Sequence, residues 1–478
     1  MIPEYDIVNM FVFSHLKNDI RKKEAMQMIS KNRDEDMCNG PIFSKIIIFS
    51  LPILAMNILQ LLFNSADLIV VGKFSGKEAM AAVGATSAII NLIVTLFIGL
   101  TAGTSVVVAQ DYGAGDAEAI RKSVHTSITV SIILGIIVMI LGFILCEPLL
   151  VMTGTPDEII NLSALYLKIY FLDIPATMIY DFGAAILRAT GDSLRPMYHL
   201  LASGILNVFL NLYFVLVQHM SVDGVAWATT ITQYLSMLLT LICLIRNKEE
   251  VIRLDMRKLK IDRGKLVKVI RIGLPAGLQS MLFSISNLLI QSAINSFGTA
   301  MIAASSASSN IEGFVSTPMN AYYNAAITFT GQNMGAKKYD RIDKAAKACT
   351  ILIFATWLIV GGLTMLLCKP LVSFFNKDPE VVRLGVIKTD ILMITYFACG
   401  IMNVFPGLTR GMGFSMLPMI CTLVGVCLMR IVWLVTIFAW FPNIYTLFAC
   451  YPVTWAITAA GQIGIFFYAR KKIRQGAI

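Results

Sequence analysis

The sequence predicts an all-α membrane protein in which twelve transmembrane helices form two six-helix lobes. Composition is the first indication, because 57% of the 478 residues are hydrophobic and only 14% are charged. Soluble domains contain about 45–50% apolar and about 25% charged residues. A mean hydropathy of +0.74 agrees with this. The other two indications are twelve long apolar stretches and a pattern that repeats in the second half of the chain.

Each apolar stretch is long enough to cross the hydrocarbon core of a bilayer, which takes about 20 helical residues. Several are longer and are expected to tilt, bend or project beyond the membrane. In chain order, the predicted spans are 44–72, 79–110, 118–146, 158–188, 194–218, 223–245, 268–295, 300–331, 343–368, 380–409, 416–440 and 443–469.

The distribution of Lys and Arg predicts the orientation of these spans. Of the 39 such residues, 31 lie in segments on the side of the N-terminus and five lie on the opposite side. Positive charge is enriched in cytoplasmic loops, so both termini are predicted to be cytoplasmic. The densest cluster lies between residues 246 and 271. The net charge of +10 is therefore attributed to topology, and no nucleic-acid partner is expected.

Two short segments share Arg, Gly, Ser and Pro at the same spacing. They are RATGDSLRP at 188–196 and RGMGFSMLP at 410–418, and each comes between the fourth and fifth span of its half. Both are predicted to be cytoplasmic turns. Gly191 and Gly413 are expected to end one helix, and a proline is expected in the first turn of the next.

Further matches appear when the chain is compared with itself at an offset of 222 or 223 residues. AQDYGAGD matches GQNMGAKK, which places Gln110 over Gln332 and Gly113 over Gly335. Ordered matches of this kind indicate a duplicated six-helix unit. Because six is an even number, both halves start on the same side of the membrane. The repeats are then parallel, and the pseudo-two-fold axis runs along the membrane normal.

The chain is predicted to act as a multi-pass monomer in the cell membrane, in contact with lipid. The predicted division is a mobile cytoplasmic tail at 1–43, an N-lobe at 44–245, a basic cytoplasmic linker at 246–267, a C-lobe at 268–469 and a cytoplasmic tail at 470–478.

The sequence carries no catalytic pattern. Nine cysteines are scattered without a CxxC pair, and four histidines have no ligand spacing. No GxSxG, HExxH or P-loop motif is present. We therefore expect no enzyme, no organic cofactor and no metal beyond a coupling ion. Two six-helix lobes joined by a basic linker are typical of secondary transporters.

The chain resembles the multidrug and toxic compound extrusion (MATE) family. The resemblance rests on LP…NSADLIVVGKFSG in the first span, AQDYGAGD after the second, LRATGDSLRP after the fourth and GLP at the start of the second lobe. It covers both lobes and leaves the N-terminal tail outside. It implies export of bulky, often cationic or amphipathic small molecules, driven by the inward flow of protons or sodium ions.

Four polar residues share one face of the first span. Asn57, Gln60, Asn64 and Asp67 are separated by three, four and three residues, which is helical spacing. Polar seams of this kind also join helices structurally, and the three amides fit that role equally well. A carboxylate in lipid is costly, so Asp67 is a candidate functional residue.

The resemblance implies that Asp67 belongs to a cation or proton site in the first lobe. Matched by motif, its partners are Asn207 and Asn211 on the fifth span and Thr229 on the sixth. Asn211 departs from the family pattern, which has Asp there. One negative charge remains, so a bound sodium ion and a proton on Asp67 both stay open. A second family branch uses acids on helices 7 and 10, which this chain lacks at the matching positions.

Two further acids lie in the fourth span. Asp173 and Asp181 are two helical turns apart. Either of them pairs with Lys168 or Arg188, or it has a role in transport.

Glu312, in the eighth span, is predicted to face a central cleft and to attract cationic substrate. Asp390 is predicted to form an interfacial pair with Lys388. Methionines suit an adaptable pocket, although most are expected to pack between helices. The residues predicted to line the cleft are Asn64, Asp181, Glu312, Gln60, Asn287, Met56 and Met281.

Together these features predict a secondary antiporter that exports lipophilic, often cationic compounds by alternating access, in exchange for protons or sodium ions. The alternative is a lipid-linked precursor flippase of the same superfamily, which tends to have extra helices and a cationic cavity. An ion channel is disfavoured because no filter-like loop is present.

Overall fold

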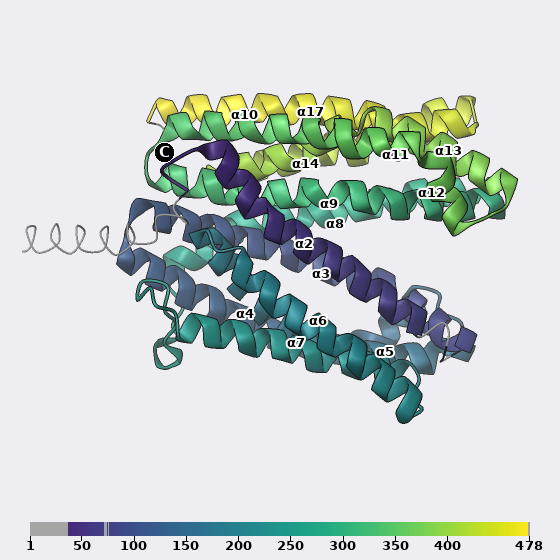
Figure 1. Ribbon diagram of the computed structural model, residues 1–478, viewed down its shortest axis with the longest axis horizontal. Helices are drawn as coiled ribbons and strands as arrows, with labels where there is room; N and C mark the ends of the chain where they lie inside the picture. The colour runs from purple at the N-terminus through teal and green to yellow at the C-terminus, as the bar shows by residue number, and fades with distance from the viewer. Residues whose placement is uncertain (1–36, 71–73, 75, 477–478) are drawn as a thin grey trace, which may run out of the picture.

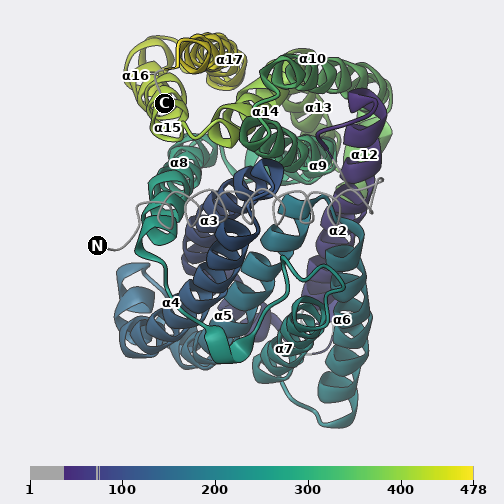
Figure 2. The ribbon, with the colours of Figure 1, turned by 90° about the vertical axis from the view of Figure 1, so that its left-hand side faces the viewer.

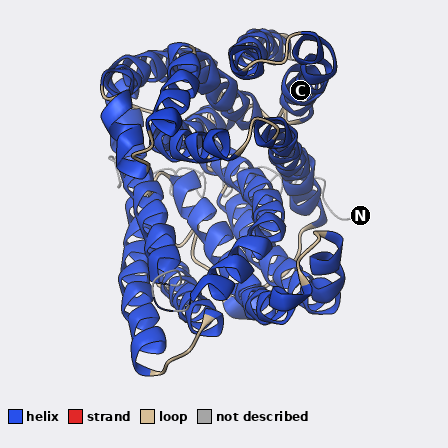
Figure 3. Ribbon diagram, turned by 90° about the vertical axis from the view of Figure 1, so that its right-hand side faces the viewer, coloured by secondary structure: helices blue, strands red, loops and turns tan. Residues whose placement is uncertain are grey.

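The computed structural model describes residues 37–70, 74 and 76–476, and every regular element within them is helical (Figure 3). Twelve helical segments follow the twelve predicted spans in order. The first six are α2 (Ile42–Val70), α3 (Gly76–Ala114), α4 (Ala117–Met152), α5 (Asp157–Thr190), α6 (Leu194–Leu212) continued by η2 (Tyr213–Val217), and α7 (Val222–Ile245). The predicted tail up to residue 36 and the predicted end of the first span lie outside the described residues.

A linker with one 3-10 turn, η3 (Met256–Lys258), leads into the second half. The six segments there are α8 (Arg263–Asn295); α9 (Thr299–Gly335); α10 (Tyr339–Thr356) continued by η4 (Trp357–Gly361) and α11 (Gly362–Leu366); α13 (Pro379–Ile394) with α14 (Tyr396–Gly411); α15 (Met416–Thr422) continued by η5 (Leu423–Leu428), α16 (Met429–Trp433) and η6 (Leu434–Phe438); and α17 (Ile444–Arg474). The short helix α12 (Cys368–Phe375) lies between the ninth and tenth segments.

Most of these segments are apolar enough to cross a membrane. Within the described residues, ten helices meet that condition, and the pair α13 and α14, bent by 53°, makes eleven. The remaining segment, α9, packs against α2, α3, α10, α13 and α14. Many of its polar residues face protein rather than lipid: the Ser308 hydroxyl, for example, lies 2.9 Å from the Thr389 hydroxyl. A helix enclosed in this way tolerates polar side chains that lipid would not.

The helices form two lobes, an N-lobe of α2–α7 and a C-lobe of α8–α17, as predicted. In Figure 1 the two lobes meet at the left-hand end and diverge toward the right. The helices α2 and α8 are the exceptions to this division, because each runs from one lobe to the other. Figure 2 shows them at opposite edges of the contact between the lobes, which is the arrangement that a pseudo-two-fold axis produces.

The first half of α2 belongs to the core of the C-lobe. Ile46 and Phe49 are buried among C-lobe residues, whereas Phe63, four turns later, lies against Gly204 of α6 in the N-lobe. The helix α8 mirrors this path. Its Gly277 lies against α3, and farther along the Leu282 carbonyl accepts a hydrogen bond from the Cys427 thiol of the C-lobe.

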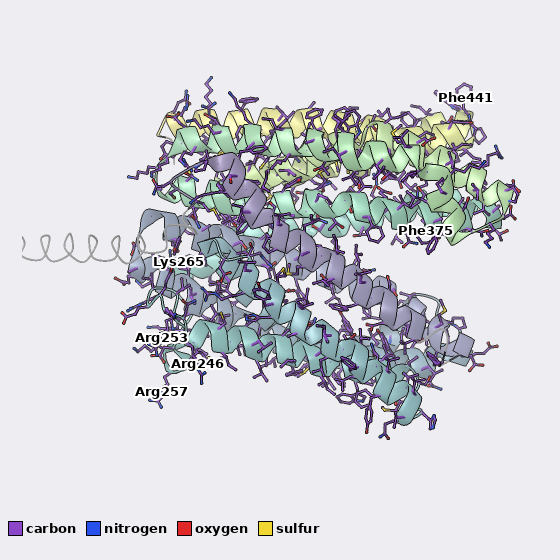
Figure 4. All side chains as sticks on the ribbon, viewed as in Figure 1. Arg246, Arg253, Arg257, Lys265, Phe375 and Phe441 are labelled. Atoms are coloured by element: carbon purple, nitrogen blue, oxygen red, sulfur yellow. The ribbon has the colours of Figure 1, made fainter. Side chains whose placement is uncertain are left out.

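The lobes are packed backbone to backbone at the end where they meet, which we call the closed end. A Cβ atom added to Gly113 would lie 1.9 Å from the Gln332 carbonyl oxygen, and one added to Gly335 would lie 1.9 Å from the Gln110 carbonyl oxygen. Only glycine permits this approach. The half-buried Lys265–Asp111 ion pair also joins α8 to α3, and Figure 4 shows Lys265 at this end of the molecule.

Local signals predicted several helix ends. Gly191 and Gly413 follow α5 and α14 with φ of 107° and 94°, which confirms the predicted turns. The helix α8 begins at Arg263, five residues before the predicted span, because the Asp262 carboxylate accepts the Lys265 backbone N–H and caps it.

Candidate functional site

Three helices of the N-lobe bring the predicted coupling residues together. Asp67 lies in the last turn of α2, Asn207 and Asn211 lie one turn apart on α6, and Thr229 lies on α7. The Asn211 amide donates a short hydrogen bond to Asp67 Oδ1, and it also donates to Asn207 Oδ1 at 3.1 Å. The Asn207 amide donates to Thr229 Oγ1 at 3.4 Å. The chain of hydrogen bonds therefore runs unbroken from α2 to α7.

This site lies inside the lobe rather than on its surface. Asn207 is 6% exposed and Asn211 is 1% exposed, while Asp67 and Thr229 are half-buried. Within the described residues Asp67 forms no ion pair, and the buried Asn211 Oδ1 atom has no hydrogen-bond partner. A carboxylate surrounded by amide and hydroxyl oxygens, with one acceptor unused, offers hard oxygen ligands to a small cation.

Acidic groups continue from this site into α5. Tyr166 lies within electrostatic reach of both Asp67 and Asp173. Asp173 is 2% exposed, and its Oδ2 atom accepts a hydrogen bond from the Thr177 hydroxyl at 3.0 Å. Its other oxygen has no partner among the described residues. The N-lobe interior is therefore rich in carboxyl groups and poor in partners for them.

The two open pairings of α5 are resolved by the structure. Lys168 pairs with Glu147 of α4 at 2.9 Å, so it is not the partner of Asp173 or Asp181. Arg188 lies within electrostatic reach of Asp181 without forming an ion pair. The sequence did not indicate Glu147, because it comes from the neighbouring helix.

The C-lobe interior has the opposite charge, which the sequence did not predict. Arg430 is fully buried, with its guanidinium carbon 4.5 Å from the Tyr451 ring centroid and 5.4 Å from that of Phe283. One of its nitrogens donates to Asn287 Oδ1 at 2.6 Å. Within the described residues Arg430 forms no ion pair, and the aromatic faces stabilise its guanidinium. The signal in the sequence was an arginine inside an apolar span.

Lys388 is the second buried cation of this lobe. It is 3% exposed and donates to the hydroxyls of Ser305 and Ser309, each at 2.9 Å. The predicted interfacial pair of Lys388 with Asp390 is therefore wrong, since Lys388 points toward α9. Glu312 lies within electrostatic reach of Lys388 and Arg430. The charge of Glu312 is consequently balanced inside the lobe, which weakens the field that it offers to a cationic substrate.

The remaining predicted cleft residues have diverse surroundings. Gln60 and Asn64 are exposed on α2, and Met281 is half-buried on α8. The Met56 sulfur accepts a hydrogen bond from Tyr180 at 3.8 Å, so it lies against α5. Asn287 is occupied by Arg430. A common cleft formed by these residues stays a prediction.

A family model described as MatE matches this chain twice, at residues 52–213 and 275–436, which together are more than half of its length. The two matches have equal length and begin 223 residues apart, at the offset found for the repeat in the sequence.

Proteins similar to this chain include transporters. It is 27% identical over 398 residues to the probable multidrug resistance protein YoeA of Bacillus subtilis, covering 80% of this chain and 84% of that protein. It is 24% identical to the FAD transporter of Shewanella oneidensis, covering 77% of this chain and 82% of that one. A crystal structure of MATE in the bent conformation has the same fold, with a TM-score of 0.85 at 22% identity, covering 92% of this chain and 98% of the other.

Proposed function

This chain belongs to the MATE family of membrane transporters, and on that basis we propose that it exports lipophilic, often cationic compounds in exchange for protons or sodium ions. The observation that carries the proposal is the uncompensated Asp67 carboxylate. It is half-buried in a transmembrane helix, and its described partner is the neutral Asn211 amide. An isolated charge in this position is costly, so binding a proton or a sodium ion there is favourable.

The arrangement of the lobes supports alternating access. The closed end has backbone contacts between the lobes at Gly113 and Gly335, and the helices diverge at the other end (Figure 1). Closure at one end and divergence at the other is one of the two states that rocking of the lobes requires. The crossing helices α2 and α8 contact both lobes, so a change in the packing of either helix alters contacts in both lobes.

Ion binding at Asp67 couples to this motion through α2. In the outward-facing state an ion binds at Asp67 and alters the hydrogen bond between α2 and α6. This change favours the return to the inward-facing state, where the ion is released and the next substrate binds. Coupling requires only that ion and substrate prefer different states or compete.

We place the closed end in the cytoplasm. Arg246, Arg253 and Arg257 lie at that end, whereas the exposed Phe375 and Phe441 lie at the opposite end (Figure 4). Clustered positive charge is typical of the cytoplasmic face, and exposed aromatic rings are typical of the membrane interface. In this orientation both termini are cytoplasmic, and the protein acts as a multi-pass monomer of the cell membrane.

A second candidate function is the transport of an anionic, lipid-linked cargo. The buried cations Arg430 and Lys388 favour it, because they give the C-lobe the positive interior that an anionic group requires. A relative that is an FAD transporter also carries an anionic molecule. The half-buried Asp67, which forms no ion pair within the described residues, favours cation export.

The deciding experiment compares wild type with Asp67→Asn in liposomes, using a fluorescent lipophilic cation. A proton gradient and a sodium gradient are imposed separately. Asp157→Asn is the matched control, because Asp157 is exposed in the first turn of α5.

Transport that one gradient drives, and that Asp67→Asn abolishes while Asp157→Asn retains it, supports the antiporter and identifies its ion. Full activity of a folded Asp67→Asn protein would contradict the coupling role. No cation transport by wild type under either gradient would favour the anionic cargo.

A further inference from the structure

The closed end contains a basic pocket that the transport mechanism does not use. It has a volume of about 910 Å³ and lies between the start of α4, the end of α7 and the linker that leads into α8. Figure 4 shows the Arg253 and Arg257 side chains at this end of the molecule. Seven lysine and arginine residues line the pocket against three acidic ones.

The pocket is built by a folded linker, not by a loose loop. Ile252 and Leu254 are 2% and 1% exposed and belong to the core formed with α3 and α4. Two backbone N–H groups fasten the linker to α4. That of Asp255 donates to His125 Nε2 at 3.1 Å, and that of Asp262 donates to Thr126 Oγ1 at 3.0 Å. The walls of the pocket are therefore held in place without a ligand.

Two of the three acidic residues of the pocket, Asp255 and Asp262, are already engaged. The Asp255 carboxylate accepts the Arg257 backbone N–H and pairs with Lys258 at 3.2 Å, and these two contacts hold its pKa below the usual range. Asp262 caps α8. These acids therefore have little capacity left to neutralise the other cations of the pocket.

Four of the lining cations have no partner for their side chains among the described residues. These four are Arg121 on α4, Arg257 and Lys260 in the linker, and Arg263 at the start of α8. Their mutual repulsion is relieved by an anion bound between them, and phosphate oxygens suit Arg and Lys donors.

The pocket also has an apolar part. Met256 and Ile261 line it and are 45% and 37% exposed, and the exposed Val267 and Ile270 follow on α8. A soluble phosphate cannot bury this apolar surface, whereas the apolar part of an amphiphile can pack against it. We propose that this pocket binds a phosphate-bearing anion, and that its source is the headgroup of an anionic phospholipid of the cytoplasmic leaflet. Basic clusters next to transmembrane helices attract such lipids.

The proposal relies on the cytoplasmic orientation proposed above, but its test does not depend on transport. The pocket variant is Arg121→Gln/Lys260→Gln/Arg263→Gln in the full chain. The control variant, Lys344→Gln/Lys347→Gln/Lys471→Gln, removes the same charge from exposed residues at the closed end of the C-lobe. All six residues are exposed, so both variants are expected to melt near the wild-type temperature in neutral detergent.

Phosphatidylglycerol is then titrated into each detergent-solubilised protein, and lipid binding is followed by native mass spectrometry and by the melting temperature. sn-Glycerol 3-phosphate and inorganic phosphate are titrated in parallel. We expect the pocket variant to bind phosphatidylglycerol on the order of a hundredfold more weakly, since each Lys or Arg near an anionic lipid contributes roughly fivefold. The control variant is expected to bind like wild type.

Selective loss of phosphatidylglycerol binding in the pocket variant supports the lipid site. If the pocket variant loses binding of glycerol phosphate or inorganic phosphate but not of phosphatidylglycerol, the pocket is a phosphate site whose ligand is a soluble molecule and not a lipid. Equal binding by the pocket and control variants for all three probes overturns the proposal, because charge at this end would then attract anions without a site. Each of these outcomes is independent of whether the protein exports cations.

Discussion

Gln110 and Gln332 make the same hydrogen bond from opposite lobes. The Gln110 amide donates to the Gly411 carbonyl of α14 at 2.8 Å, and the Gln332 amide donates to the Ala189 carbonyl of α5 at 2.8 Å. The two donors are 222 residues apart, and so are the two acceptors. Equivalent residues of the repeat therefore make equivalent contacts across the pseudo-two-fold axis. Each glutamine binds the carboxyl end of a helix in the other lobe, where backbone carbonyls lack helical partners.

We predict that these two hydrogen bonds stabilise the closed end. The double variant Gln110→Ala/Gln332→Ala loses about 1 kcal/mol per bond between the lobes, or about 2 kcal/mol at the closed end, and it also loses the hydrogen bond that Gln332 Oε1 accepts from the Met37 backbone N–H. If this acts on the lobe equilibrium alone, the population open at this end rises roughly thirtyfold. Hydrogen exchange at the carboxyl ends of α5 and α14 measures the change. Gln291→Ala is the control, because the Gln291 amide donates to Asn295 of the same helix, α8. Unchanged hydrogen exchange in the double variant would show that the two glutamines do not stabilise the closed end.

The glycines beside these residues are predicted to be essential for closure. Gly113→Ala and Gly335→Ala each place a Cβ atom within 2 Å of a carbonyl oxygen in the other lobe, so the lobes must separate. We expect both variants to lose most transport and to expose the closed end to proteolysis.

Gly84→Ala is the matched control for Gly113→Ala, since it lies in the same helix with open space around it. There alanine is expected to stabilise the helix by about 0.5–1 kcal/mol. Normal transport by Gly113→Ala would show that the closed end does not have to close this tightly.

Asn211 is predicted to tune the ion site. Asn211→Ala removes the described hydrogen-bond donor of Asp67 and one candidate ligand oxygen. A hydrogen bond to a charged group contributes about 1.5–3 kcal/mol, so the apparent affinity for the coupling ion should change by roughly tenfold or more. The ion dependence of transport in liposomes measures this. Asn310→Ala is the control, because Asn310 is exposed and its amide donates to the Ser306 carbonyl of its own helix. Equal ion dependence in both variants would place the coupling site elsewhere.

Glu312 is predicted to matter for both stability and transport. Glu312→Gln leaves Lys388 and Arg430 without the carboxylate that balances them. Loss of a charge partner in a buried site is destabilising, here by about 2 kcal/mol of unfolding free energy, since the groups are not in direct contact. Thermal unfolding measures this, with the exposed Glu380→Gln as control. If Glu312→Gln also leaves the transport of every cationic dye unchanged, Glu312 has no role in attracting substrate.

Local patterns in the sequence predicted much of the fold. Long apolar stretches predict membrane helices because the bilayer imposes one length and one chemistry on all of them. The two Arg-Gly-Ser-Pro segments predicted turns correctly, since Gly191 and Gly413 alone supply the required backbone conformation. The span at 300–331 was also found, although α9 is less apolar than the others. The packing of α9 against other helices explains why this span can be less apolar than the others.

The candidate site was predicted less evenly. Asp67 and its partners are recognisable because helical spacing puts Asn207 and Asn211 on one face, and the family resemblance supplies the match to α2 and α7. The buried cations of the C-lobe were missed. An arginine in a span is visible in the sequence, but the rings of Phe283 and Tyr451 that stabilise it come from distant helices.

By itself, the sequence determined the class of the protein, the number and order of its membrane spans, the duplication and the acid in the first span. These follow from local hydropathy and spacing, which do not depend on long-range contacts. Only the tertiary structure decided that α2 and α8 cross between the lobes, that Gln110 and Gln332 bind the opposite lobe, and that the linker folds into a basic pocket. The reason is physical: each of these depends on close contacts between segments far apart in the chain.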